Sequence, residues 1–392
     1  MRSAGFRFRF IQNYLSASAV AVKGEFEAFT GPINKFKSDI AVAMPVASCT
    51  PGNGTLQGFA TGGVTADMSQ WSAACEFMTD SDVVEFACYQ NNAPPLVFQV
   101  DGQYVDRIGT VGAGAGNATQ YTKLTFASQR ARRIRVMWCC DQPIPGSPML
   151  AVKPNCDFWK PPMSQVLRMG VVGDSFIEAY VNAALDTNGP YAMRLPYAPM
   201  AILAGELLGM RDTRQHGVGG SGFVNPGTGR SKAVNQIPYW IMHAPHDLLV
   251  VAYVYNDNNA NQVGGVNITS AQILAEMAAW LPIVRATEQD TPIVVLGAGG
   301  GIRNNSASVL ANEQALSDGV AAWNDPLTAF AKVSSADTPW ISGTGYEGAT
   351  QSTGNSSRYV SEDTTHSNVA GHEYWGYKIA EAVRDAVYSM AA

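Results

Sequence analysis

Charged residues are scarce in this sequence of 392 residues: they make up 15% of the chain, against about a quarter in an average soluble domain. The charge is also divided unevenly, with 14 basic and 12 acidic residues up to position 160 and 12 basic and 20 acidic ones after it. Neither half therefore carries the basic stripe that nucleic-acid binding requires. No apolar run approaches the length of a membrane-spanning helix, so we expect neither a nucleic-acid partner nor a membrane span.

Cysteine is absent after position 156, which excludes thiol chemistry from the second half of the chain. The six cysteines are Cys49, Cys75, Cys88, Cys139, Cys140 and Cys156, and none has the Cys-x-x-Cys spacing of a zinc site. Gln12 and Asn13 interrupt what would be the apolar core of a signal peptide. Without a clear secretion signal, buried thiols are favoured over disulfides, whereas the low charge and the 38 glycines favour an extracellular or particle-associated protein.

The pattern of apolar runs divides the chain into three parts. Residues 1–50 show no sustained periodicity and are expected to be irregular. Residues 51–160 contain short strand-like runs without helical stretches between them, and Asp101-Gly102 is a hairpin signal, so this part is predicted to be a β-sandwich. The runs are residues 83–86, 96–100, 123–126 and 133–137. Paired prolines within residues 154–162 mark the boundary with the third part, residues 161–392.

In residues 161–392, buried strands alternate with helices. Strands are predicted at 167–172, 247–254 and 292–296, and helices near 199–208, 231–243, 270–285 and 307–330. Four apolar residues spaced by four predict one buried face of a C-terminal helix: Trp375, Ile379, Val383 and Val387. Such alternation predicts a three-layer α/β/α domain with a parallel sheet, and a site at the carboxyl ends of its strands.

The stretch from Val166 to Tyr180 organises this third part. Its apolar run ends in Gly173-Asp174-Ser175, and a helix-compatible segment follows. A serine on a turn between a strand and a helix has its hydroxyl outside the sheet and amides beside it, as nucleophilic catalysis requires. The alternative is an ordinary turn, because turns favour these residue types anyway.

A base for this serine is available near the C-terminus. Asp363 and His366 lie three residues apart before the last helix, so the carboxylate can fix the tautomer of the imidazole while the ring faces the serine. The alternative is a polar loop in which Ser367 caps the helix.

Two further segments offer hydrogen-bond donors for an oxyanion. The glycine-rich residues 216–222 follow a predicted strand and expose backbone amides, and the strand over 247–254 delivers Asn256 at its carboxyl end. Backbone and side-chain amides of this kind stabilise the charge that develops in acyl transfer. Separately, each segment is an ordinary glycine loop or strand end.

In their order along the chain, the four segments resemble the blocks of the SGNH hydrolases, also called the GDSL esterase/lipase family, over roughly residues 165–390. The resemblance implies that Ser175 is the nucleophile and that His366 and Asp363 are the base and its orienting carboxylate. It also implies an oxyanion hole made by the Ser175 N–H, the Gly220 N–H and the Asn256 side chain.

The N-terminal β region, in particular residues 96–136, looks like the jelly-roll domain that precedes the catalytic domain in two-domain carbohydrate esterases. Together the resemblances imply a serine ester hydrolase that works through an acyl-enzyme, needs no cofactor or metal, and removes O-acetyl groups from carbohydrate. Two alternatives stay open. One is a lipase- or arylesterase-type relative that acts on other acyl esters; the other is a carbohydrate-binding or surface-structural protein with a vestigial hydrolase domain.

Four residues next to the predicted catalytic groups are candidates for lining the substrate site: Phe176, Phe223, Val254 and Tyr255. Val254 stands where the SGNH family usually has glycine, and it is expected to narrow the acyl pocket together with Phe176. The glycines of residues 297–301 lack the last glycine of a dinucleotide fingerprint and predict a tight loop at a strand end. The pair His243 and His246 has no third ligand beside it, so no metal site is expected.

Overall fold

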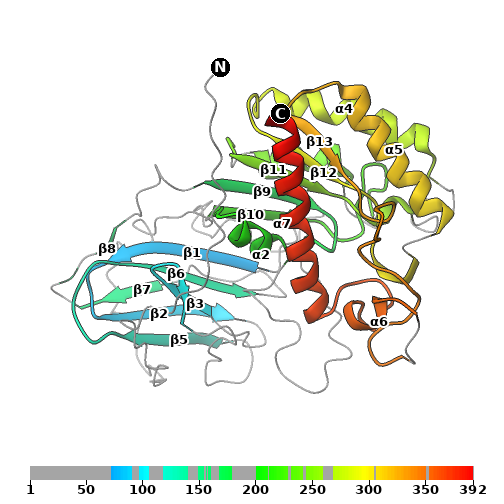
Figure 1. Ribbon diagram of the computed structural model, residues 1–392. Coiled ribbons are helices and arrows are strands. Elements are labelled where there is room, and N and C mark those ends of the chain that lie inside the picture. Colours follow the sequence, from blue (N-terminus) through cyan, green and yellow to red (C-terminus); the bar gives the residue numbers. More distant parts are fainter. Residues whose placement is uncertain are drawn as a thin grey trace.

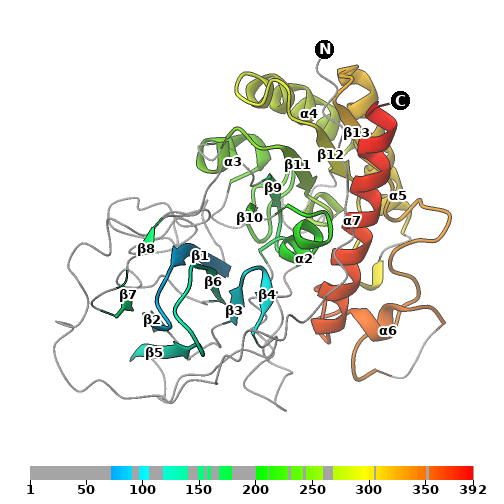
Figure 2. The same ribbon diagram turned by 60° about the vertical axis from the view of Figure 1, so that its left-hand side comes forward.

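The computed structural model describes residues 72–90, 97–105, 118–139, 149–153, 156, 158–159, 167–178, 200–210, 212–227, 231–241, 244–258, 268–303, 306–349 and 353–391. The segment 1–50, predicted to be irregular, lies outside these residues. The described chain forms an N-terminal β region followed by an α/β region (Figures 1 and 2).

Two antiparallel sheets form the N-terminal β region. One has the order β4 (Gln103–Tyr104), β3 (Val97–Val100), β6 (Arg132–Cys139), β1 (Ser72–Thr79) and β8 (Phe158–Trp159). The other has the order β5 (Ala118–Thr125), β2 (Val83–Gln90) and β7 (Met149–Val152), and the two sheets lie side by side in both ribbon views (Figures 1 and 2).

The centre of the first of these sheets is buried, and its apolar side chains alternate with buried polar ones, Gln99 and Arg135. Phe98 and Val100 of β3 and Ile134 and Val136 of β6 are all nearly inaccessible to solvent. The predicted hairpin is confirmed, because Asp101 (φ 53°) and Gly102 (φ 82°) join β3 to β4 with the positive φ angles of a tight hairpin turn. The jelly-roll connectivity stays a prediction.

A parallel five-stranded sheet is the centre of the α/β region. Its order is β10 (Asp212–Gly217), β9 (Arg168–Gly173), β11 (Leu248–Ala252), β12 (Ile293–Leu296) and β13 (Thr328–Ala331), and all neighbours are parallel. The chain runs outward from β9 to β10 and then crosses back to β11 on the other side of β9. Open parallel sheets bind ligands at the carboxyl ends of the strands at such a reversal.

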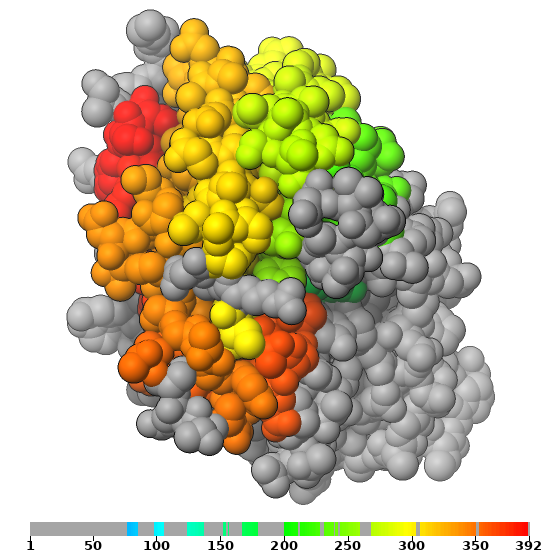
Figure 3. Space-filling model, turned by 90° about the vertical axis from the view of Figure 1, so that its right-hand side faces the viewer, coloured from blue at the N-terminus to red at the C-terminus, as the bar shows by residue number. Residues whose placement is uncertain are grey.

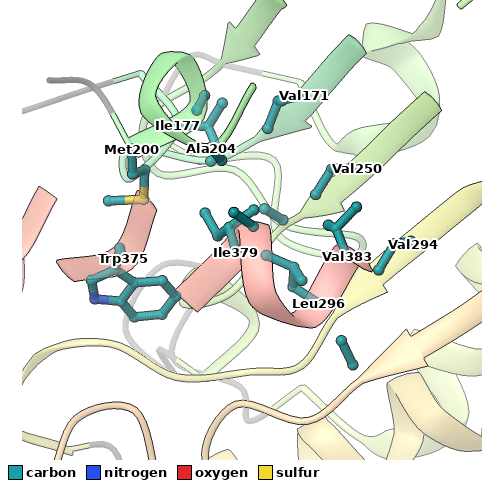
Figure 4. Close-up of a cluster of buried hydrophobic side chains, with 14 of the residues drawn as sticks. Val171, Ile177, Met200, Ala204, Val250, Val294, Leu296, Trp375, Ile379 and Val383 are labelled. Carbon is teal, nitrogen blue, oxygen red and sulfur yellow. The ribbon is translucent and has the colours of Figure 1, made fainter. Parts of the chain in front are cut away.

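Helices cover both faces of this sheet. The helices α2 (Met200–Leu207) and α7 (Val369–Ala391) pack on one face, where their apolar side chains meet those of the strands (Figure 4). The helices α3 (Ala233–Trp240), α4 (Ser270–Arg285) and α5 (Ala307–Trp323) pack on the other.

Successive residues of each central strand point to opposite faces of the sheet, and each face has its own hydrophobic core. Val171 and Val250 are part of the core under α2 and α7, whereas Val172 and Val251 are part of the core under α3, α4 and α5. A strand buried on both faces reads as a continuous apolar run, which is why the sequence indicated these strands. The three-layer α/β architecture is confirmed, and so is the buried face of α7 with Trp375, Ile379, Val383 and Val387.

One prediction about a helix end is wrong, and the alternative in which Ser367 caps the last helix is not what the structure has. The helix expected over 307–330 ends at Trp323, because Asn324 adopts a left-handed conformation (φ 49°) that stops an α-helix, and β13 follows. The N-terminal cap of α7 is Asn368, whose side chain accepts a hydrogen bond from the Gly371 N–H (2.8 Å), whereas Ser367 pairs with Val360 in an isolated β-bridge.

Hydrogen bonds join the two regions at Glu206 of α2. The Glu206 Oε1 atom accepts hydrogen bonds from the Gln99 Nε2 atom of β3 (2.8 Å) and from the Tyr104 hydroxyl of β4. None of the described helices is long and apolar enough to cross a membrane.

Candidate active site

The turn after β9 holds Ser175 at the carboxyl end of the sheet. The N–H groups of Ile177 and Glu178 donate to the Asp174 carbonyl at 3.0 and 2.9 Å, so the chain enters a helical turn directly after the strand. Gly173 is required here because a Cβ atom would lie 2.5 Å from the Ala252 carbonyl oxygen of β11. The serine is therefore held at the reversal between β9 and β11.

His366 reaches Ser175 from a segment 191 residues further along the chain. The His366 Nε2 atom lies 2.9 Å from the Ser175 Oγ atom, and its Nδ1 atom lies 2.5 Å from the Asp363 Oδ2 atom. Because Nδ1 faces a carboxylate, it carries the ring proton, and Nε2 is left as an acceptor for the serine proton. The structure thus joins the three predicted residues in a chain of hydrogen bonds.

The Asp363 carboxylate is fixed by its second oxygen. Asp363 Oδ1 accepts hydrogen bonds from the Ser361 hydroxyl (2.8 Å), the Thr365 N–H (2.9 Å) and the His366 N–H (2.8 Å). Partial burial by itself would raise the pKa of Asp363, but the hydrogen bond to the His366 ring, its charge and the backbone donors outweigh burial and hold the pKa well below its usual range. Asp363 is therefore ionised throughout the neutral range.

A glycine after β12 lies against the segment that carries Asp363 and His366. A Cβ atom on Gly301 (φ 65°) would lie 2.7 Å from the Thr364 carbonyl oxygen, and the Ile302 N–H donates to that oxygen at 3.0 Å. The two segments adjoin at the surface in Figure 3, the residues near 300 in yellow and those near 365 in red-orange. The loop was predicted only as a tight strand end, because nothing local in the sequence showed its contact with residues 364–365.

Asn256 lies in the short 3₁₀ helix η3 (Asn256–Asn258) after β11. Its Nδ2 atom donates to the Ser221 carbonyl at 3.0 Å. An asparagine side chain has two N–H donors, so this bond orients the amide and leaves the second hydrogen for another acceptor. The bond also ties Asn256 to the glycine-rich segment that contains Gly219 and Gly220 (φ 80°).

The buried carboxylate of Asp257 holds that glycine-rich segment in place. Asp257 accepts hydrogen bonds from the N–H groups of Phe223 (2.8 Å), Val224 (3.1 Å) and Asn225 (2.9 Å). Burial raises the pKa of Asp257, although the three backbone donors partly offset the shift. The segments after β10 and β11 therefore form one hydrogen-bonded unit.

Of the four predicted lining residues, three are core residues. Phe176, Phe223 and Val254 expose only 2%, 1% and 1% of their surface. The Phe176 ring packs between two other rings, with its centroid 5.7 Å from that of His366 and 5.8 Å from that of Trp375. Phe176 and Val254 belong to the core under α2 and α7, and Phe223 belongs to the core under α3, α4 and α5. The expectation that these three contact an acyl group is therefore corrected, because almost none of their surface is accessible.

Tyr255 is the remaining lining candidate and is partly exposed. Its hydroxyl lies 3.5 Å from the Thr365 Oγ1 atom, so the ring extends from the end of β11 to the segment that carries His366. Trp340 and Trp375 are buried in the core, and their rings pack against each other.

The described residues contain no cluster of three or more histidine, cysteine, aspartate or glutamate side chains that could hold a metal ion. His246 instead pairs with Glu288 at 2.5 Å, and both side chains are almost wholly buried. Of the cysteines, Cys156 is a buried free thiol.

No protein-family model and no curated protein sequence matches this chain. Solved structures do match its fold. A family 2 carbohydrate esterase from Clostridium thermocellum, solved in complex with cellohexaose, is 12% identical with a TM-score of 0.57, and the match covers 85% of this chain and 98% of that one. A protein from Bacteroides ovatus described as a GDSL-like lipase is 14% identical with a TM-score of 0.51, over 81% and 85% of the two chains.

An acetyl xylan esterase from the rumen bacterium Butyrivibrio proteoclasticus is 11% identical with a TM-score of 0.52, over 82% of this chain and 91% of that one. Residues 161–392 make up less than two thirds of the sequence, whereas these three matches cover 81%, 85% and 82% of it. The matches therefore also include part of the N-terminal β region. The chain therefore has the fold of an SGNH hydrolase and resembles the family 2 carbohydrate esterases.

Proposed function

We propose that this protein is a serine ester hydrolase that removes O-acetyl groups from carbohydrate through an acyl-enzyme. The observation that carries the proposal is the chain of hydrogen bonds from Ser175 Oγ to His366 Nε2 (2.9 Å) and from His366 Nδ1 to Asp363 Oδ2 (2.5 Å). A serine hydroxyl is a weak nucleophile unless a base accepts its proton, and an oriented imidazole is such a base.

The reaction follows from these positions. Ser175 Oγ attacks the ester carbonyl carbon while its proton moves to His366 Nε2, and the carbonyl oxygen becomes an oxyanion. The N–H groups of Ser175 and Gly220 and the second N–H of Asn256 stabilise that oxyanion. When the carbon–oxygen bond to the alcohol breaks, His366 gives the proton to the leaving oxygen. Water, deprotonated by His366, then releases the acid and restores the serine.

The fold supports carbohydrate acetyl ester as the substrate class. The matching structures include a family 2 carbohydrate esterase and an acetyl xylan esterase, and each match extends beyond the hydrolase part into the β region. Hydrogen bonds from Gln99 and Tyr104 to Glu206 also join that β region to the α2 helix. The jelly-roll form of the β region is part of this proposal.

The first test is hydrolysis of p-nitrophenyl acetate, followed by acetate release from a panel of acetylated glycans. Ser175→Ala is expected to lower kcat by several orders of magnitude, because only the oxyanion donors and substrate binding remain. A fluorophosphonate is expected to label Ser175 and not Ser221, whose hydroxyl is buried and donates to the Val218 carbonyl (2.5 Å). Label on Ser221 would contradict the proposed nucleophile.

Acyl chain length separates the proposal from its main alternative. We expect kcat/KM for p-nitrophenyl esters to fall from acetyl through butyryl to octanoyl. A preference for octanoyl would favour a lipase-type hydrolase and leave the catalytic residues unchanged. Binding of glycans without hydrolysis of any ester would favour a binding protein with a vestigial site.

A further inference from the structure

Asp174, the residue before the nucleophile, has a fully buried side chain that the proposed reaction does not use. Its Oδ1 atom accepts a hydrogen bond from the Phe176 N–H (3.0 Å), and its Oδ2 atom accepts one from the Tyr255 N–H (3.0 Å). Phe176 follows Ser175, and Tyr255 precedes Asn256. One carboxylate therefore connects the turn of the nucleophile to the segment that carries the oxyanion donor.

The neighbours of this carboxylate are backbone N–H donors, those of Phe176 and Tyr255 and also that of Val254, so the geometry favours the ionised form. A protonated carboxyl group would carry an O–H that has no acceptor among these N–H groups and would accept their hydrogen bonds less strongly, because its charge is gone. Burial raises the pKa of Asp174 to about 7, although the N–H groups of Phe176, Tyr255 and Val254 and the charge of His366 partly offset the shift. The group thus changes its charge in the range where an imidazole also does.

His366 and Tyr253 are the titratable side chains that act on Asp174. Tyr253 is buried, and burial together with the charges of Asp174 and Asp257 raises its pKa, so it stays neutral at any pH used for an assay. His366, from the segment before α7, is the other neighbour, and it must be neutral to accept the serine proton.

We propose that Asp174 is a positioning residue whose ionised carboxylate aligns Ser175 with Asn256, so that the site is active only when Asp174 is ionised and His366 is neutral. The proposal rests on the proposed function, because it assumes that Ser175 and Asn256 act on the same carbonyl group. Two protons must then leave the site before it is active, one from each residue.

The pH profile of the wild-type protein is the first test. If two groups must lose protons, the logarithm of kcat/KM rises with a slope that approaches two on the acid side, whereas a single base gives a slope of one. In Asp174→Asn the slope is expected to fall to one, because one of the two titrating groups is gone. A slope of one in the wild type would overturn the proposal.

The variant also reports on alignment. The side-chain amide that Asp174→Asn introduces has a single acceptor oxygen and can accept only one of the Phe176 and Tyr255 N–H groups. We therefore expect kcat to fall by about 10²-fold, as for a misplacement of roughly 1 Å, with little change in KM.

Glu313→Gln is the matched control. Glu313 is likewise a buried carboxylate that accepts backbone N–H groups, from Val333 (2.7 Å) and Ser334 (2.8 Å), yet it lies outside the site. Its variant is expected to keep the slope of two.

A spectroscopic measurement keeps the proposal testable if Asp174→Asn does not fold, or if the protein hydrolyses no ester. In wild-type protein with ¹³C-labelled aspartate carboxyls, one carboxyl resonance is expected to titrate near pH 7. The amide proton shifts of Phe176 and Tyr255 should follow the same curve. If the protein hydrolyses no ester but the shifts titrate as expected, only the proposed function is overturned. If the amide shifts do not change with pH, the role of Asp174 is overturned.

Discussion

Asp363→Asn tests how the base is oriented, and the structure determines what the substitution does. Three donors converge on Asp363 Oδ1: the Ser361 hydroxyl and the N–H groups of Thr365 and His366. In the variant, the amide oxygen takes this position because it is the only acceptor of the new side chain. The amide nitrogen must then take the place of Oδ2, opposite His366 Nδ1.

An N–H donor opposite Nδ1 reverses the imidazole tautomer. His366 Nδ1 becomes the acceptor and the ring proton moves to Nε2, which faces Ser175 Oγ at 2.9 Å. A protonated Nε2 cannot accept the serine proton, so the base is disabled although the geometry is kept. A loss of this type lowers kcat by about 10⁴-fold, which corresponds to roughly 5.4 kcal/mol of transition-state stabilisation.

The assay is steady-state hydrolysis of p-nitrophenyl acetate at neutral pH, with circular dichroism as a check on folding. Ser361→Ala is the matched control, since it removes one donor to Oδ1 and leaves the contact of Oδ2 with His366; we expect it to lower kcat by less than about 10-fold. His366→Ala should retain less activity than Asp363→Asn, because it removes the base itself. A folded Asp363→Asn with more than about a tenth of the wild-type kcat would refute the reasoning.

Three further predictions follow from named contacts. Asn256→Ala removes one proposed oxyanion donor and should lower kcat by roughly 10²–10³-fold with little change in KM; a rise in KM alone would mean that Asn256 binds the substrate and the transition state equally. Gly217→Ala places a Cβ atom 2.0 Å from the Glu178 nitrogen, so urea unfolding should show a loss of about 1–3 kcal/mol, and unchanged stability would argue against this close approach of β10 to the nucleophile turn. Glu288→Gln should lower the free energy of unfolding by roughly 1–3 kcal/mol at neutral pH by weakening the contact with His246. Burial alone would raise the pKa of Glu288, but its hydrogen bonds with His246 and Thr291 hold the pKa below its usual value of 4.5. The difference in stability between wild type and variant should therefore be full above pH 4.5 and shrink as the pH falls through the folded-state pKa. A difference that grows toward acid pH would contradict this.

Short-range patterns in the sequence predicted the segments that form the candidate site. The apolar run before Gly173 predicted a buried strand, and the strand β9 ends at that glycine. The spacing of Asp363 and His366 predicted that the two side chains meet, and they do so at 2.5 Å. These predictions succeeded because strands, turns and contacts three residues apart depend on neighbouring residues.

Contacts between distant segments could not be predicted in this way. The roles of Asp174 and Asp257 depend on N–H groups 81 and 32–34 residues away, those of Tyr255 and of Phe223 to Asn225. A buried carboxylate that accepts backbone hydrogen bonds has no local signature in the sequence. The strand β13 was missed for a related reason, since four residues at the edge of a sheet are too few to show a period.

The sequence by itself determined that buried strands alternate with helices, that Ser175 follows the first of these strands, and that an aspartate and a histidine precede the last helix. Only the tertiary structure decided which face of each segment is buried, and it placed Phe176, Phe223 and Val254 in the core. The physical reason is that all three follow the ends of buried strands, where an apolar side chain can either pack into a core or line the site, and the sequence does not distinguish these two positions. The same holds for Ser175 and His366, 191 residues apart, because only the order of strands in the sheet brings them within 2.9 Å.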